Sequence, residues 1–125
     1  MTISWSDVRT RKRYIREAKK APFLDAVFLI HYYNRDVKCW GPPPRPPDID
    51  PSEVFADFDQ AQYQRALLLA QRLLSASIAV GAAFFKYPDS KRSYKDELAH
   101  FKAINPGFSD SSYSKAVEAG IRNMR

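Results

Sequence analysis

Residues 59–86, DQAQYQRALLLAQRLLSASIAVGAAFFK, decide the fold of this chain. From Tyr63 to Phe85 apolar and small side chains recur at every third or fourth position, which is the spacing of one helix face. Asp59 is placed to cap the first turn. The second half of the stretch is rich in Ser, Ala and Gly, which allow a neighbouring helix to approach closely. The sequence therefore predicts one long central helix that acts as the hub of the core.

Two shorter helices are predicted after this hub. Residues 87–89 (Tyr-Pro-Asp) end the central helix, and residues 93–96 (Ser-Tyr-Lys-Asp) have the S-x-x-D form of a helix start. Residues 105–107 (Asn-Pro-Gly) end that second helix. The last helix is predicted to begin within residues 109–112, and its apolar stripe keeps the helical period as far as Met124.

Before the hub, the chain contains a proline-rich connector and an apolar run. Residues 41–51, GPPPRPPDIDP, predict an extended, stiff crossover. Residues 50–53 (Asp-Pro-Ser-Glu) favour the start of a short helix that continues to Phe58. The apolar run predicts a buried helix over residues 22–34, and its aromatic content also allows a strand hairpin over residues 23–40.

The first predicted helix covers residues 5–20 and is strongly basic. Ser4 and Asp7 give it the S-x-x-D form of a capping box. Its apolar stripe is thin, so only a narrow edge is expected to pack on the rest of the chain. That stripe consists of Trp5, Val8, Ile15 and Ala18.

Length and composition indicate one all-α domain over residues 1–125, a compact bundle of about five helices. The chain has 125 residues, of which 45% are hydrophobic and 14% aromatic, as expected of an ordered globular protein. The single cysteine, Cys39, excludes an internal disulfide and favours a reducing compartment. The longest uninterrupted apolar run, residues 78–85, is shorter than the roughly 20 residues of a membrane span. We expect a cytoplasmic protein without a membrane partner.

Charge is unevenly distributed along the chain. The net charge is +6, and the first 20 residues supply +5 of it. The acidic residues between positions 48 and 59 have no Lys or Arg among them; they are Asp48, Asp50, Glu53, Asp57 and Asp59. The candidate partner-binding residues are the cations of the first helix, Arg9, Arg11, Lys12, Arg13, Arg16, Lys19 and Lys20.

These cations have a structural interpretation and two functional ones. They can pair with the acidic residues of the chain, where an exposed ion pair contributes at most about 1 kcal/mol. They can instead bind phosphates or the acidic surface of another protein. Nucleic-acid modules usually carry a second signal, such as aromatic platforms beside basic residues. Because the sequence shows no such signal, it favours pairing within the chain or a protein partner over DNA or RNA, which stays the alternative. A homodimer is compatible with any of these.

No catalytic, cofactor or metal motif is apparent. The acidic residues from Asp48 to Glu53 lack the glycine that a calcium loop of the EF-hand type needs, because Glu53 occupies that position. His31, His100 and Cys39 are too few to define an active site. We expect a non-enzymatic protein that uses no cofactor and holds no metal.

The C-terminal 30 residues resemble the ends of small helical bacterial proteins, among them immunity proteins that neutralise a toxin. The residues that carry the resemblance are Leu98, Phe101, residues 105–109 and Tyr113. The chain departs from many immunity proteins in being basic, and no binding residue can be transferred from them. The resulting prediction is a protein-binding module, of the type of a bacterial immunity or effector-partner protein, that acts through its basic first helix.

Overall fold

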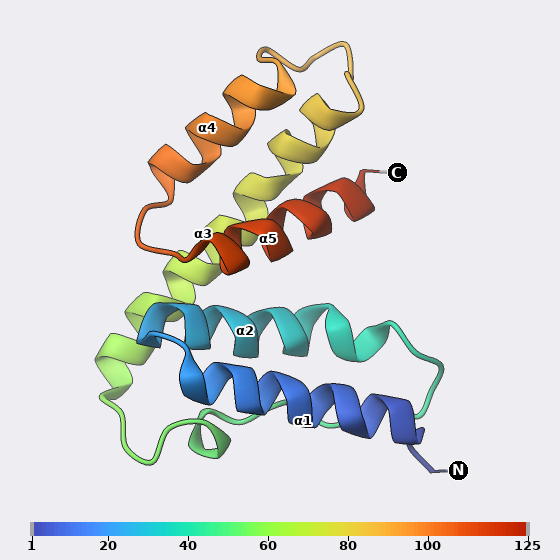
Figure 1. Cartoon of the computed structure of the whole chain (residues 1–125), viewed down its shortest axis with the longest axis vertical. Coiled ribbons are helices and arrows are strands. Elements are labelled where there is room, and N and C mark those ends of the chain that lie inside the picture. The colour runs from blue at the N-terminus through green and yellow to red at the C-terminus, as the bar shows by residue number, and fades with distance from the viewer. Residues whose placement is uncertain (1, 125) are drawn as a thin grey trace. The chain divides into compact units, whose positions relative to one another are not determined.

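The computed structural model describes residues 2–124, which form five α-helices, two short 3₁₀ helices and no strand (Figure 1). The predicted all-α class is therefore confirmed. Backbone contacts divide the chain into two compact units, Met1–Leu67 and Leu68–Arg125. The boundary falls within α3 (Gln60–Phe84), the predicted long helix, which contributes side chains to the cores of both units.

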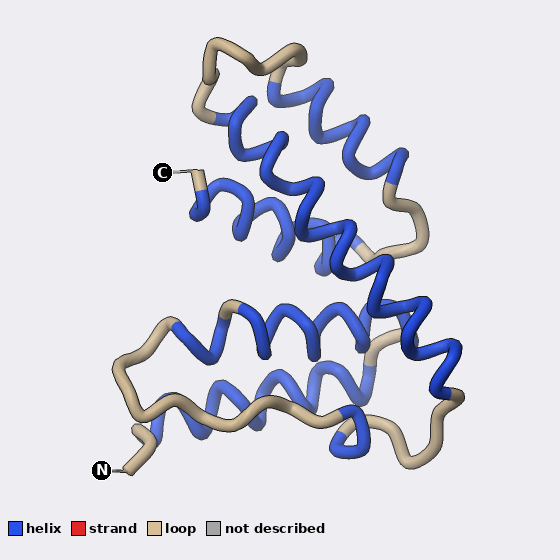
Figure 2. The backbone as a smooth tube through the Cα atoms, turned by 180° about the vertical axis from the view of Figure 1, so that it is seen from behind, coloured by secondary structure: helices blue, strands red, loops and turns tan. Residues whose placement is uncertain are grey.

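The first unit is built on two helices, α1 (Trp5–Lys20) and α2 (Phe23–Arg35), which lie side by side in both views (Figures 1 and 2). Helix α2 is the buried element, with Ala26, Val27 and Phe28 completely shielded from solvent. It is followed, after Asp36, by the 3₁₀ helix η1 (Val37–Cys39), so the hairpin alternative for residues 23–40 is wrong. The run is helical because Pro22 fixes an extended residue just before the first turn and no turn signal interrupts the apolar stretch.

The proline-rich connector returns along α1 as an irregular segment (Figure 2). It leads into the 3₁₀ helix η2 (Pro51–Glu53), which begins where predicted and whose N-cap Asp50 forms a capping box with Glu53. The expected continuation of this helix to Phe58 is wrong, because Phe55 and Phe58 instead pack against Tyr63 at ring-centroid distances of 6.5 and 5.4 Å. Burial of these aromatic rings favours a chain path that departs from the helix.

The second unit contains the rest of α3 together with α4 (Tyr94–Ile104) and α5 (Asp110–Asn123). Helices α3 and α5 meet at their small residues: a Cβ on Gly120 would lie 2.1 Å from the carbonyl oxygen of Ser77. A Cβ on Gly81 would likewise lie 2.3 Å from the carbonyl oxygen of Gly120. The predicted close approach is thus a backbone-to-backbone contact. The Tyr113 hydroxyl donates to the carbonyl of Asn105 over 2.6 Å and joins α5 to the end of α4.

By length and composition alone, α3 also meets the criterion for a membrane-spanning helix. Its most apolar window has a mean hydropathy of 1.6, and 39% of that window is buried. Exposed apolar side chains on the helix include Leu68, Leu69 and Ile78. The core helix of a soluble protein meets the same criterion, so this property by itself does not place α3 in a membrane.

Candidate functional site

Helix α1 is held by a narrow edge, and this fixes which of its residues face solvent. The helix begins where predicted, with the Asp7 N–H donating to Ser4 Oγ over 3.1 Å. Only Tyr14 and Ala18 are buried, and Tyr14 packs on Tyr33 of α2 with ring centroids 5.5 Å apart. The side of α1 away from this edge is exposed.

Six cations share the exposed side of α1, and we call them the cationic face. They are Arg9, Lys12, Arg13, Arg16, Lys19 and Lys20. Positions 9, 12, 16 and 19 follow one another at three- and four-residue spacing, which aligns them along a single helix face. Positions 13 and 20 flank that line, and neither acid of α1, Asp7 or Glu17, falls on it. The line itself therefore presents positive charge without a carboxylate, and the exposed Glu17 lies beside it, four positions after Arg13 and three before Lys20.

Trp5 stands at the N-terminal end of the cationic face. Its side chain is 72% exposed, and the Arg9 guanidinium carbon lies over the indole, 4.6 Å from the ring centroid. The expectation that Trp5 belongs to the packing stripe is therefore wrong. Trp5 lies four positions before Arg9 and seven before Lys12, so it falls on the same side of the helix as the cations. The spacing in the sequence already groups Trp5 with the cations. Because its side chain is apolar, a prediction from sequence assigns it to the packed edge instead.

A shallow groove of about 400 Å³ runs between Trp5 and the first cations of the face. Its walls include the side chains of Arg9, Arg13 and Arg16. Such a groove offers one aromatic surface together with several guanidinium groups, each of which can bind a carboxylate or phosphate through two hydrogen bonds.

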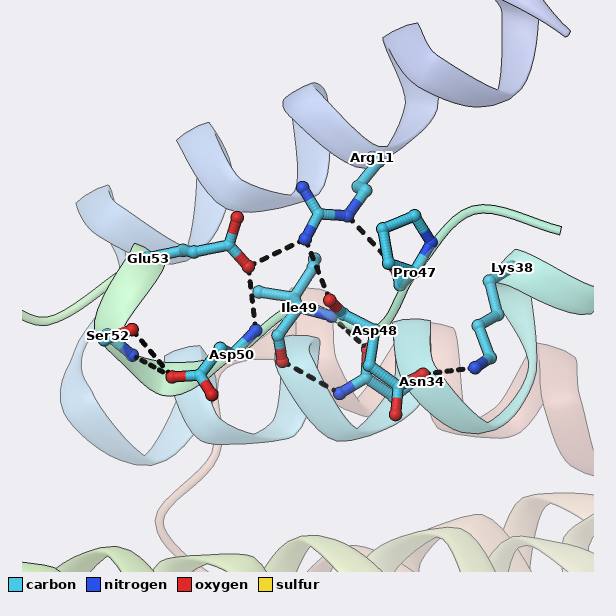
Figure 3. A network of polar contacts seen from close by, with 9 residues as sticks. All are labelled: Arg11, Asn34, Lys38, Pro47, Asp48, Ile49, Asp50, Ser52 and Glu53. Atoms are coloured by element: carbon cyan, nitrogen blue, oxygen red, sulfur yellow. Dashed lines mark hydrogen bonds and ion pairs between the residues drawn. The ribbon is translucent and has the colours of Figure 1, made fainter. Parts of the chain in front are cut away.

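Arg11, a predicted partner-binding residue, is not part of this face (Figure 3). Its Nε donates to the carbonyl of Pro47 over 3.0 Å, and its Nη2 donates to the carbonyl of Asp48 over 2.8 Å. The same Nη2 forms an ion pair with Glu53 over 2.7 Å. Arg11 therefore fastens the connector to α1, because its position in the helical register points it toward the packed edge.

Most of the acidic residues in the connector region are also engaged inside the first unit. The Asp50 carboxylate accepts from the Ser52 N–H over 2.9 Å, and Glu53 accepts from the Asp50 N–H over 2.9 Å. Asp48 pairs with Lys38, and Asp59 accepts from the Gln62 N–H at the start of α3. The acidic stretch thus serves mainly as helix caps and as anchors for the connector (Figure 3).

These contacts stabilise the ionised form of two carboxylates. Hydrogen bonds from the hydroxyl and then the N–H of Ser52 lower the pKa of Asp50. The pKa of Glu53 is lowered by the Asp50 N–H and, second, by Arg11. Both groups are acceptors in their charged state, which is the cause of the lower pKa.

The first unit is acidic outside the cationic face. Its residues other than the six cations comprise five basic and nine acidic ones. A positive strip on an otherwise negative unit favours a ligand whose negative charge is confined to the area of the strip.

The residues considered for catalysis lie on different elements: His31 on α2, Cys39 in η1 and His100 on α4. His31 lies on α2, where burial and then the charge of Arg35 lower its pKa, and its Nε2 has no hydrogen-bond partner. Cys39 is exposed in η1. Among residues 2–124, no group of three His, Cys, Asp or Glu side chains is placed to hold a metal ion.

No family model, curated protein or solved structure matches the chain.

Proposed function

We propose that this chain is a non-enzymatic binding module that recognises an acidic surface on another protein through the cationic face of α1. The observation that carries the proposal is the co-alignment of six exposed cations and Trp5 along one side of α1, with the exposed Glu17 at its edge. Trp and Arg are the residue types on which protein interfaces most often depend.

The helical setting of the cations supports this proposal. The backbone of α1 is ordered and capped, so the charges are already aligned before a partner arrives and their alignment entails no loss of backbone entropy. A concentrated positive field of this kind raises the association rate with an acidic partner and makes that rate sensitive to salt. An acidic toxin or effector protein is a partner with the required chemistry.

A charge-reversal experiment tests the proposal. The variant carries Arg9→Glu, Arg13→Glu and Arg16→Glu, and the matched control carries Arg45→Glu, Arg65→Glu and Arg72→Glu, three exposed arginines outside α1. Each is used to capture proteins from a nuclease-treated lysate of the source cells, with quantification by mass spectrometry. We expect the α1 variant to lose an acidic protein that wild type and control retain. Equal capture by all three would contradict the proposal.

A nucleic acid is the second candidate, because an exposed Trp5 beside Arg9 is an aromatic platform next to basic residues. Neutralisation of about six phosphates would give a slope near −5 in a plot of log affinity against log salt concentration. Titration of labelled DNA and RNA at several salt concentrations measures that slope. The nine acidic residues of the same unit disfavour this candidate, since they would repel a polyanion that extends beyond the face.

A second copy of the chain is a less suitable partner. The acids that would meet the cationic face of another copy include Asp48, Asp50 and Glu53, and each already binds a group within its own unit. Light scattering at low and high salt tests this point directly.

A further inference from the structure

The cationic face contains one residue that electrostatics does not explain. Trp5 exposes 72% of a large apolar side chain, the largest exposed fraction among the exposed large hydrophobic residues of the described part of the chain, whereas Tyr32 and Tyr33 of the same unit are buried. A ligand that offered negative charge alone would leave most of this indole in water. An apolar group that covered it would gain the free energy of removing that surface from water.

The surroundings of Trp5 restrict what that apolar group can be. Arg9 covers one part of the indole, and the groove beside it opens toward Arg13 and Arg16. At about 400 Å³ the groove lies near the lower end of the range in which small groups bind, about 300–1,000 Å³. One aromatic or aliphatic side chain fits there with carboxylates on either side of it.

We propose that the ligand of the cationic face is an acidic peptide segment with a large apolar side chain among its carboxylates, and that Trp5 packs against that side chain. This inference rests on the proposed function and adds the sequence class of the partner. The carboxylates pair with Arg9, Arg13 and Arg16, while the apolar side chain fills the groove. The charges then raise the association rate, and the contact with Trp5 makes the cationic face selective among acidic segments.

A polynucleotide satisfies these features less well. The Arg9 guanidinium lies over the indole at 4.6 Å and restricts a base and an apolar side chain alike, so charge and not stacking separates the two ligands. The acidic remainder of the unit also limits the length of polyanion that can lie along α1. A short acidic segment avoids this repulsion.

Two synthetic heptapeptides test the inference. Both alternate Asp and Glu, and they differ only at the central residue, which is Phe in one and Ser in the other. Calorimetric titration at low salt measures the affinity of each peptide for the full chain. We expect the Phe peptide to bind about tenfold more tightly, as burial of part of an aromatic pair gives. Trp5→Ala removes this preference, Trp5→Phe restores part of it, and the matched control Trp40→Ala leaves it intact.

Different outcomes separate this inference from the function on which it rests. If the two peptides bind with equal affinity, and reversal of Arg9, Arg13 and Arg16 abolishes the binding of both, the role of Trp5 is wrong. The proposal of an acidic partner is then still supported. If charge reversal leaves the affinity for the peptides unchanged, or if neither peptide binds, both proposals are contradicted. A single-stranded oligonucleotide of equal charge that binds more tightly than the Phe peptide would overturn the peptide in favour of a nucleic acid. Circular dichroism checks that each variant keeps its helices.

Discussion

At the scale of single residues, helical register decides the role of each cation on α1. Arg9 and Arg11 are two positions apart and chemically identical, yet Arg9 lies over an exposed indole and Arg11 binds two carbonyls and a carboxylate. The helix caps could be predicted from sequence, because each depends only on residues within one turn. Trp5 could not be placed by composition, since an apolar side chain is expected on the packed edge.

Arg11→Ala is expected to destabilise the chain, whereas Lys12→Ala is not. The Arg11 change removes charged hydrogen bonds to Pro47, Asp48 and Glu53 and leaves those acceptors without this donor, a loss of about 2 kcal/mol. Lys12 is exposed on the cationic face, so its truncation should change the free energy of unfolding by about 0.5 kcal/mol or less. Urea denaturation measures both. Equal stability of the two variants would contradict the assignment of Arg11 to the fold.

The carboxylate of Glu53 gives a prediction for pH dependence. Its pKa in the folded chain lies below the ordinary value of 4.5, so the unfolded chain binds more protons in that range. The stability that Glu53 contributes is therefore complete above pH 4.5 and is lost as the pH falls through the folded-state value. Glu53→Gln should be less stable than wild type at neutral pH, and the difference should shrink in acid. Urea denaturation across this range checks it, with the exposed Glu118→Gln as control.

At the scale of elements, local sequence predicted the helices well and predicted their packing only in part. Helix α1 spans the predicted Trp5–Lys20, and α3 begins and ends within two residues of its prediction. The 3₁₀ helix η2 is shorter than expected because burial of Phe55 and Phe58 against Tyr63 depends on contacts that no local pattern encodes. The small residues of α3 indicated a close neighbour, and the structure identifies that neighbour as α5.

Gly120→Ala tests the contact between α3 and α5. In an exposed helix this change would stabilise the chain, because alanine favours the helix by about 0.5–1 kcal/mol. Here the new methyl group would meet the backbone of Ser77 at 2.1 Å, so we expect destabilisation by about 2–3 kcal/mol. Thermal unfolding monitored by circular dichroism shows whether Gly120→Ala lowers or raises the melting temperature. A lower melting temperature supports the close contact, and a higher one would show that the helices are farther apart.

The end of α3 offers a stabilising substitution. Lys86 has a φ of 56°, in the left-handed region. The Lys86 N–H donates to the carbonyl of Ala83, and the Tyr87 N–H donates to the carbonyl of Ala82. These two hydrogen bonds are the pattern of a Schellman motif. Glycine adopts this conformation without strain, so Lys86→Gly should raise the free energy of unfolding by about 1 kcal/mol. Lys86→Ala keeps the strain and should give no gain. Urea denaturation measures the free energy of unfolding of both variants. An equal change in the two would exclude backbone strain at position 86 as the cause of the gain.

At the scale of the whole molecule, charge is segregated more sharply than sequence alone indicated. The sequence showed a basic N-terminal segment and an acidic stretch, and the structure assigns most of the acids to caps and connector contacts. What remains on the first unit is a strip of six exposed cations on α1 with an exposed indole at one end. That arrangement depends on which edge of α1 packs, and sequence periodicity alone did not determine the edge.

The central claim is that Trp5 stands exposed within this cationic strip, and ion-selective quenching of its fluorescence tests it most directly. The chain has two tryptophans, so in a Trp40→Phe variant all tryptophan emission comes from Trp5. The cations should concentrate iodide and repel caesium, and added sodium chloride should weaken iodide quenching by screening. We predict strong, salt-sensitive quenching by iodide and little by caesium. Equal quenching by the two ions, or quenching by iodide that salt does not change, would contradict the account.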